Sequence, residues 1–311
     1  MLLRNCFVIL IAAICMYCVL SSHYKQNAFF SVLDCGEQVS QDSTLLHAED
    51  IERNIWIYWE QGWENPPVLV QQCLVSWQKY NSKWTIHMLD STSIPKYLPC
   101  LKLSHIPTVQ ARSDVLRVEL LKEYGGVWVD ATLFCTRPLD EWLGPYLDRE
   151  VTMFTYRYKY SFLQSRISPI SSWFLAAKKH TYLIEAFAKE VKIYWQNLDL
   201  PRKGYFWFHT IFHELIQKNP EAAEQWRCAH PNTLYPHIFH GYGMYNLSPE
   251  VIEDVNRQQT PCYKLNWKAH IYKDTNLAYL FYFHNGTPHT TWPSCPRFPK
   301  DMPGILSFLK K

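Results

Sequence analysis

The chain has 311 residues, of which 48% are hydrophobic, 16% aromatic and 19% charged, and its formal net charge is +3. This composition supplies a large packed core and excludes an intrinsically disordered regulator. The nearly balanced charge excludes a protein that coats nucleic acid, so no nucleic-acid partner is expected. Ten cysteines are too few for a disulfide scaffold, and those beyond residue 20 are too widely spaced for a CxxC metal site.

The N-terminal segment differs from the rest of the chain. Residues 6–20 form an uncharged run that spans roughly 22 Å as a helix, which is short for a bilayer core of about 30 Å. Arg4 precedes the run and favours a cytoplasmic N-terminus. We interpret residues 1–22 as a transmembrane anchor or a signal segment, with a buried first helix as the remaining alternative.

Both leading interpretations place the rest of the chain on the lumenal or extracytoplasmic side of a membrane. An uncleaved anchor makes a single-pass membrane protein, Golgi-like if the cell is eukaryotic, and a cleaved signal makes a secreted one. Residues 23–50 contain one basic residue, Lys25, among several acidic ones, which indicates a stem or linker. We expect residues 51–311 to form a single domain.

From residue 51 onward, strand and helix patterns alternate. Runs of β-branched and aromatic residues predict strands at 54–59, 84–89 and 127–134. Apolar residues near helical spacing predict a helix at 68–80, and the stretch that follows Ile106 and Pro107 predicts a second helix at 108–124. Gly125 and Gly126 supply the stop after the second helix. This order predicts an α/β fold with a mostly parallel central sheet flanked by helices.

Charged residues gather where ligands bind in such sheets, beyond the carboxyl ends of the strands. Asp90 follows the second predicted strand, and Asp130 lies late in the third. Asp114 and Arg117 are three residues apart and share a helix face; a surface ion pair is the alternative interpretation. Asp130 lies in an apolar run, where an unpaired carboxylate is costly, so it is either a ligand-binding or a satisfied structural residue.

The stretch that contains these residues is recognisable. Residues 113–132 read SDVLRVELLKEYGGVWVDAT. This block resembles the SDxxR and DXD motifs of the capsular polysaccharide synthesis glycosyltransferase family, which is of GT-A type. Weaker similarity at residues 55–62, 73–77, 171–177, 205–212 and 264–268 extends the resemblance over about 51–270.

The resemblance implies a GT-A nucleotide-diphospho-sugar transferase fold preceded by an N-terminal hydrophobic helix. It implies transfer of a hexose-type sugar from a nucleotide-sugar donor to a glycan or glycoconjugate acceptor, with retention of configuration. Asp130 is then catalytic and binds the donor. The other implied donor-binding residues are Trp59, Asp114, Arg117 and Gly126, and the acceptor-side candidates are Ser172 and Trp173.

One residue departs from the family motif. Thr132 stands at the second acidic position of DXD, and a neutral hydroxyl binds Mg²⁺ or Mn²⁺ poorly. The predicted Mn²⁺ or Mg²⁺ cofactor is therefore in doubt. Either Asp130 forms a metal site with Asn266 or His270, or Arg117 and lysines neutralise the leaving group without a metal.

Two non-catalytic alternatives remain open at this level. The first is a catalytically silent nucleotide-sugar or glycan-binding partner protein, which Thr132 motivates. The second is an aromatic-rich carbohydrate-binding module without donor chemistry. His209 and His213 have the spacing of zinc ligands on one helix face, but the HExxH pattern is absent, and packed histidines are the simpler interpretation.

Overall fold

The computed structural model describes residues 51–147, 151–156, 170–197, 203–227, 236–239 and 248–294. The predicted anchor or signal segment at 1–22 and the predicted stem at 23–50 lie outside the described residues, so both stay predictions. Within the described ranges, no helix has the length and apolar character needed to cross a membrane.

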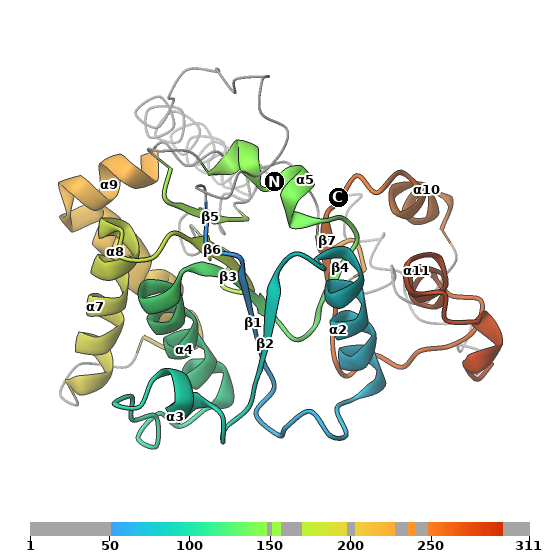
Figure 1. Ribbon diagram of the computed structural model, residues 1–311, viewed down its shortest axis with the longest axis horizontal. Helices are drawn as coiled ribbons and strands as arrows, with labels where there is room; N and C mark the ends of the chain where they lie inside the picture. Colours follow the sequence, from blue (N-terminus) through green and yellow to red (C-terminus); the bar gives the residue numbers. More distant parts are fainter. Residues whose placement is uncertain are drawn as a thin grey trace, which may run out of the picture.

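A five-stranded sheet and a two-stranded sheet form the centre of the described chain (Figure 1). The strands are β1 (Asn54–Tyr58), β2 (Thr85–Leu89), β3 (Gly126–Asp130), β4 (Leu133–Cys135), β5 (Met153–Thr155), β6 (Phe174–Ala177) and β7 (Cys262–Lys264). The helices are α2 (Val68–Tyr80), α3 (Ile94–Tyr97), α4 (Val109–Tyr124), α5 (Leu139–Trp142), α7 (Tyr182–Gln196), α8 (Trp207–Lys218), α9 (Pro220–Arg227), α10 (Pro249–Arg257) and α11 (Asn276–Asn285). Short 3-10 turns lie at Gly144–Tyr146 and His289–Thr291.

The large sheet has the strand order β2-β1-β3-β6-β5. Strands β2, β1 and β3 are parallel, and β6 runs antiparallel to both of its neighbours, β3 and β5. All strands except β6 therefore point the same way. This arrangement confirms the predicted α/β class with a mostly parallel central sheet.

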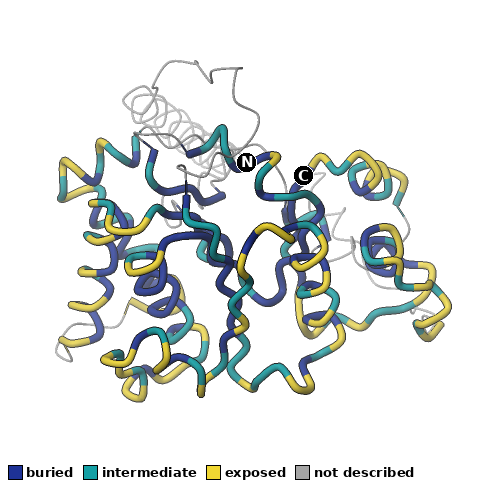
Figure 2. Tube along the Cα trace, in the orientation of Figure 1, coloured by how far each residue is buried: buried dark blue, intermediate teal, exposed yellow. Residues whose placement is uncertain are grey.

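The strands alternate their side chains between two cores. Trp56 of β1 and Trp128 of β3 pack toward α4, α7 and α8, which cover one face of the sheet (Figure 1). Ile57 and Val129, one position further along, pack toward α2 and α5 on the other face. A third apolar cluster joins α2 to β4, β7, α10 and α11. Figure 2 shows the inner strands of the large sheet buried, the edge strand β2 partly exposed and the outer helices exposed on one side.

The single strand predicted at 127–134 is wrong: it is two strands. β3 ends at Asp130, a turn follows at residues 131–132, and β4 then pairs antiparallel with β7 in the smaller sheet. The backbone N–H of Leu265 donates to the carbonyl of Thr132 over 2.9 Å and holds the turn. Both strands are buried, so an unbroken apolar run does not reveal the change of sheet.

Gly126 is required by the close approach of β1 and β3. Its φ is +98°, and a Cβ built on it lies 2.3 Å from the carbonyl oxygen of Asn54. A side chain there strains the backbone and pushes against a neighbouring strand rather than against a flexible side chain.

We expect Gly126→Ala to lower the free energy of unfolding by about 3 kcal/mol or more, measured by urea denaturation. Gly286→Ala is the matched control, because Gly286 also has a positive φ, +72°, but faces open space. Its cost is expected to be about 1 kcal/mol. Equal losses in the two variants contradict the assigned clash.

Candidate active site

The carboxyl ends of the parallel strands meet at one edge of the large sheet. Tyr58 at the end of β1 lies opposite both Leu89 of β2 and Asp130 of β3. The antiparallel strand β6 begins beside them, and the backbone N–H of Asp130 donates to the carbonyl of Trp173 over 3.0 Å. The structure thus brings the predicted residues Trp59, Asp130 and Trp173 to the same edge.

Arg117 projects from α4 beneath this edge. Its guanidinium pairs with the carboxylate of Asp114, and its Nη2 lies 3.3 Å from Oδ1 of Asp130. The rings of Trp128 and Phe208 lie 5.1 and 5.5 Å from the guanidinium carbon, within the range of cation–π attraction. The Arg117 side chain is 3% exposed, so the alternative interpretation of a surface ion pair is wrong.

Lys264 approaches Asp130 from the other side. Its Nζ donates to Oδ2 of Asp130 over 2.8 Å and to Oγ1 of Thr132 over 2.6 Å. Trp128 Nε1 donates to Oδ1 of Asp130 over 3.1 Å. Two carboxyl groups and two cations therefore form one compact group, hereafter the Asp130 cluster: Asp114, Arg117, Asp130 and Lys264.

The cluster holds its two carboxylates in different states. Burial raises the pKa of Asp114 to about 7; the charge of Arg117 opposes this rise, and the charge of Asp130 adds to it. Burial also disfavours ionisation of Asp130, but Lys264 and Arg117 outweigh it and hold the pKa of Asp130 below its usual value. Asp130 is therefore the permanent anion of the cluster, and it is 26% exposed at the side chain.

Aromatic residues flank the cluster. Trp59 meets the ring of Trp267 at a centroid distance of 6.2 Å in an edge-on arrangement, and Trp267 is 49% exposed. Trp173 is buried and stacks on Tyr156 at 4.8 Å, while Ser172 lies half-buried in the turn before it. The edge of the sheet thus offers ring surface next to the charged group.

Gly126 does not join these residues. It lies at the first position of β3, at the opposite end of the strand from Asp130, and its tight packing on Asn54 gives it a structural role. Asp90 does lie at the edge, but its carboxylate accepts hydrogen bonds from the backbone N–H groups of Thr92 and Ser93. It caps the turn after β2.

The side-chain atoms around Asp130 do not match the ligands of a divalent-metal site. Both oxygens of Asp130 already accept hydrogen bonds from cationic or N–H donors, and hard divalent ions prefer several anionic or carbonyl oxygens. The described residues contain no group of three His, Cys, Asp or Glu residues placed to hold a metal ion. Asn266 Oδ1 instead accepts from the backbone of Lys268, and His270 stacks on Tyr272.

The two histidines of α8 are packing residues. Burial, with a contribution from Arg117, lowers the pKa of His209 to about 4, so its ring is neutral near Phe208 and Arg117. Burial lowers the pKa of His213 as well. Within the described chain neither histidine belongs to a group of three metal-ligating residues.

Two residues of the site escape prediction from local patterns. Lys264 and Trp267 lie in the segment 264–268, whose similarity to the family is weak, and no spacing rule links them to Asp130. The signal is a lysine that ends the buried strand Cys262–Lys264. A charged side chain in that position needs a partner, and sequence alone does not name it.

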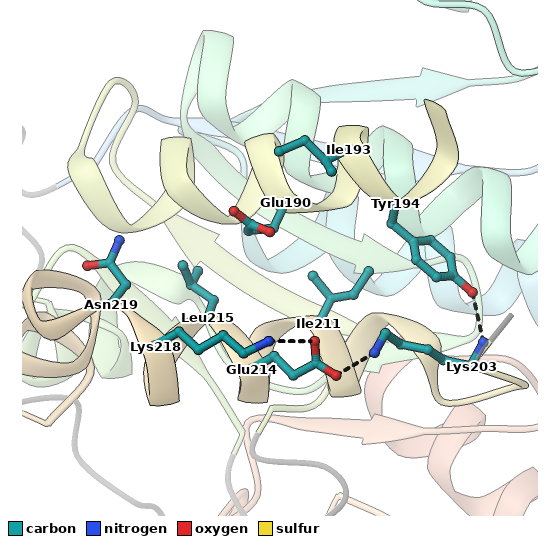
Figure 3. Close-up of a pocket in the computed structure, with 9 residues that line it drawn as sticks. All are labelled: Glu190, Ile193, Tyr194, Lys203, Ile211, Glu214, Leu215, Lys218 and Asn219. Carbon is teal, nitrogen blue, oxygen red and sulfur yellow. Dashed lines mark hydrogen bonds and ion pairs between the residues drawn. The ribbon is translucent and has the colours of Figure 1, made fainter. Parts of the chain in front are cut away.

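A hollow of about 280 Å³ lies elsewhere, between α7 and α8 (Figure 3). At its rim Glu214 pairs with Lys203 and Lys218, and the backbone N–H of Lys203 donates to Tyr194 Oη. These polar groups satisfy one another, and none belongs to the Asp130 cluster. We therefore place the candidate active site at the cluster.

The chain matches a known protein family over most of its length. A family model described as capsular polysaccharide synthesis protein matches residues 32–284. The chain belongs to the capsular polysaccharide synthesis family. The family match contains every member of the Asp130 cluster, including Lys264.

Three curated glycosyltransferases are similar to this chain at low sequence identity. Glycosyltransferase afumC of Aspergillus fumigatus is 28% identical over 161 residues, which cover 47% of this chain and 41% of the relative. O-glycosyltransferase braB of Annulohypoxylon truncatum is 29% identical over 120 residues, covering 34% of this chain and 28% of the relative. O-glycosyltransferase PaGT of Phomopsis amygdali is 27% identical over 161 residues, covering 46% and 39%. The chain thus spans less than half the length of each relative.

Among solved structures, the PaToxG glycosyltransferase is similar to this family member with a TM-score of 0.38 and 15% sequence identity. The similar region covers 55% of this chain and 70% of that one.

We expect Arg117→Met to lower the free energy of unfolding by roughly 3–5 kcal/mol, because it leaves buried carboxylates without their cation. The loss is expected to be larger at pH 8 than at pH 5. Asp114 has a folded pKa of about 7, above its unfolded value of about 3.9, so its contribution is present at low pH and is lost as the pH rises through this window. Removing Arg117 raises that pKa further. Urea denaturation at both pH values measures the difference.

Arg53→Met is the matched control, because Arg53 forms an ion pair with Asp140 that is partly exposed. Its loss is expected to cost at most about 1 kcal/mol. A loss for Arg117→Met that is no greater than the control, or that is greater at pH 5, contradicts the assigned role of the guanidinium.

Proposed function

We propose that this chain is a GT-A glycosyltransferase that moves a hexose-type sugar from a nucleotide-sugar donor to a glycan or glycoconjugate acceptor. Three observations support the proposal: the family match, relatives whose names are glycosyltransferases, and the Asp130 cluster at the carboxyl edge of the sheet. The last carries the most weight, because it is a chemically specific arrangement rather than a similarity.

The cluster has the properties that such a donor requires. A nucleotide sugar presents hydroxyl groups, which donate to carboxylates, and a diphosphate, which needs cations or N–H donors. Asp130 is ionised and partly exposed, and Lys264 lies beside it with its side chain 17% exposed. Arg117 is buried and pairs with both carboxylates, so its role is to hold Asp114 and Asp130 in place beneath the donor.

The aromatic residues suit the remaining parts of the two substrates. The exposed ring of Trp267 and its partner Trp59 offer apolar surface to a nucleobase or a sugar face. Trp173 lies beside Asp130 through a backbone hydrogen bond, and Ser172 precedes it in the chain; we assign both to the acceptor side. The nucleotide-sugar donor and the glycan acceptor then meet at the exposed edge of Asp130.

The second candidate function is a catalytically silent nucleotide-sugar or glycan-binding protein. It is favoured by Thr132, whose hydroxyl accepts a hydrogen bond from Lys264 where the DXD motif has an acid. A thermal-shift panel of UDP and GDP sugars, with and without Mn²⁺, followed by donor-hydrolysis assays, distinguishes the two functions. Binding with turnover supports the enzyme, and binding without turnover supports the silent protein.

We expect Asp130→Asn to reduce transfer or donor hydrolysis about 100- to 1,000-fold, because it removes the negative charge that binds the nucleotide sugar and pairs with Lys264 and Arg117. The fold is expected to persist, since the amide keeps the shape of the side chain. Asp140→Asn is the matched control, because Asp140 pairs with Arg53, which precedes β1 at the opposite end of that strand. Wild-type activity in Asp130→Asn removes the catalytic assignment of Asp130.

The proposed transfer retains the configuration of the sugar. In such a step the bond between the anomeric carbon and the diphosphate breaks, the acceptor oxygen bonds to the same face, and the leaving phosphate oxygen takes the acceptor proton. An inverting enzyme needs a side-chain general base at the acceptor, and Asp130 is committed to Lys264 and Arg117. Proton NMR of the first product measures the anomeric configuration, and an inverted product overturns this part of the proposal.

A further inference from the structure

A cation already lies between Asp130 and Thr132, the residues at the two acidic positions of the DXD motif. Lys264 Nζ lies 2.8 Å from Oδ2 of Asp130 and 2.6 Å from Oγ1 of Thr132. In a DXD motif these are the two positions whose acids face a divalent ion. Here one acid and one hydroxyl face an ammonium group, which carries a single charge and three N–H donors.

The backbone of Lys264 is fixed on both sides, and its ammonium group is held by Asp130 and Thr132. Lys264 ends β7, where it lies opposite Leu133 of β4. Its own N–H donates to the carbonyl of Pro236 over 2.8 Å, and the N–H of the next residue, Leu265, donates to the carbonyl of Thr132 over 2.9 Å. The charge is thus held at a defined place before any substrate binds, as electrostatic stabilisation of a developing charge requires.

Lys264 is also the cation of the cluster that a ligand can reach. Its side chain is 17% exposed, against 3% for Arg117. Two of its three N–H bonds are directed to Asp130 and Thr132, and the third has no acceptor among the described residues. A phosphate oxygen at the exposed edge of Asp130 fits that third donor.

We infer that Lys264 supplies the positive charge that a divalent metal supplies in DXD enzymes, so that donor binding and transfer need no metal ion. This inference rests on the proposed function. In the transfer step the carbon–oxygen bond to the diphosphate breaks with its electron pair on the phosphate oxygen, and the acceptor oxygen forms the new bond to carbon. The acceptor proton passes to the phosphate; Lys264 keeps its own proton and stabilises the leaving charge.

The test is calorimetric titration of the full chain with UDP and with GDP, each in EDTA and in Mn²⁺. The wild type is expected to bind at least one nucleotide with the same affinity in both conditions. Lys264→Met is expected to weaken that binding about 10- to 100-fold in EDTA, because it loses a charge-assisted hydrogen bond. Lys264→Arg, which keeps the charge, is expected to lose less. Lys273→Met, at an exposed lysine outside the cluster, is the control.

A second variant tests directly whether a metal ion can take the place of the Lys264 ammonium group. Thr132→Asp combined with Lys264→Ala restores two acids and removes the ammonium group, so it is expected to gain Mn²⁺ binding, measured by the loss of the free-ion EPR signal. The wild type is expected to leave that signal unchanged, with and without UDP. This readout needs no turnover, and melting curves of each variant verify that it is folded.

The outcomes separate the two proposals. Nucleotide binding by the wild type that requires Mn²⁺, or Lys264→Met binding as tightly as the wild type in EDTA, overturns the role of Lys264 and leaves the glycosyltransferase proposal standing. Stoichiometric Mn²⁺ binding by the wild type also overturns it. No binding of either nucleotide or of any nucleotide sugar in either condition overturns the proposed function and the inference with it.

Discussion

The pairing of buried charges around Asp130 constrains the rest of the structure. The carboxyl groups of Asp114 on α4 and Asp130 on β3 repel each other when both are ionised, and removal from water makes each charge costly. Arg117 lies between Asp114 and Asp130 and is itself enclosed by Trp128 and Phe208. Helix α4, strand β3 and helix α8 must therefore pack in one relative position for the charges to be compensated. The same packing leaves one edge of Asp130 at the surface.

The site combines a local part with a distant part. Helix α4 and strand β3 are joined by the two glycines at 125 and 126, so Asp114, Arg117 and Asp130 come together through a short stretch of chain. Lys264 reaches them from 134 residues away through the pairing of β4 with β7. The local part supplies the anions and a buried cation, and the distant part supplies the cation that lies nearer to solvent.

The two parts differ in how well sequence predicts them. Strands β1 and β2 and helices α2 and α4 agree with their predicted ranges to within a residue or two. Runs of β-branched and aromatic residues mark the strands, apolar spacing marks α2, and the glycines at 125 and 126 mark the end of α4. The burial of Arg117 and the ionisation of Asp130 depend on helix α8 and strand β7, which no spacing within residues 113–132 reveals. The break between β3 and β4 is hidden for a similar reason, since both strands are apolar and only their partners differ. Gly126 shows how a motif residue can have a packing role that its motif does not reveal, because its close contact with Asn54 appears only once β1 and β3 pair.

The pairing of β4 with β7 also governs the order in which the molecule is completed during synthesis. Residue 264 is synthesised long after the first three strands of the large sheet and helix α4, so until then the chain lacks the ammonium group that pairs with Asp130. The apolar faces of α2 and β4 are likewise buried only when the segment that forms β7, α10 and α11 packs against them. The charged centre therefore cannot be complete before residue 264 has been synthesised, so the third apolar core and the site both depend on the same late part of the described chain.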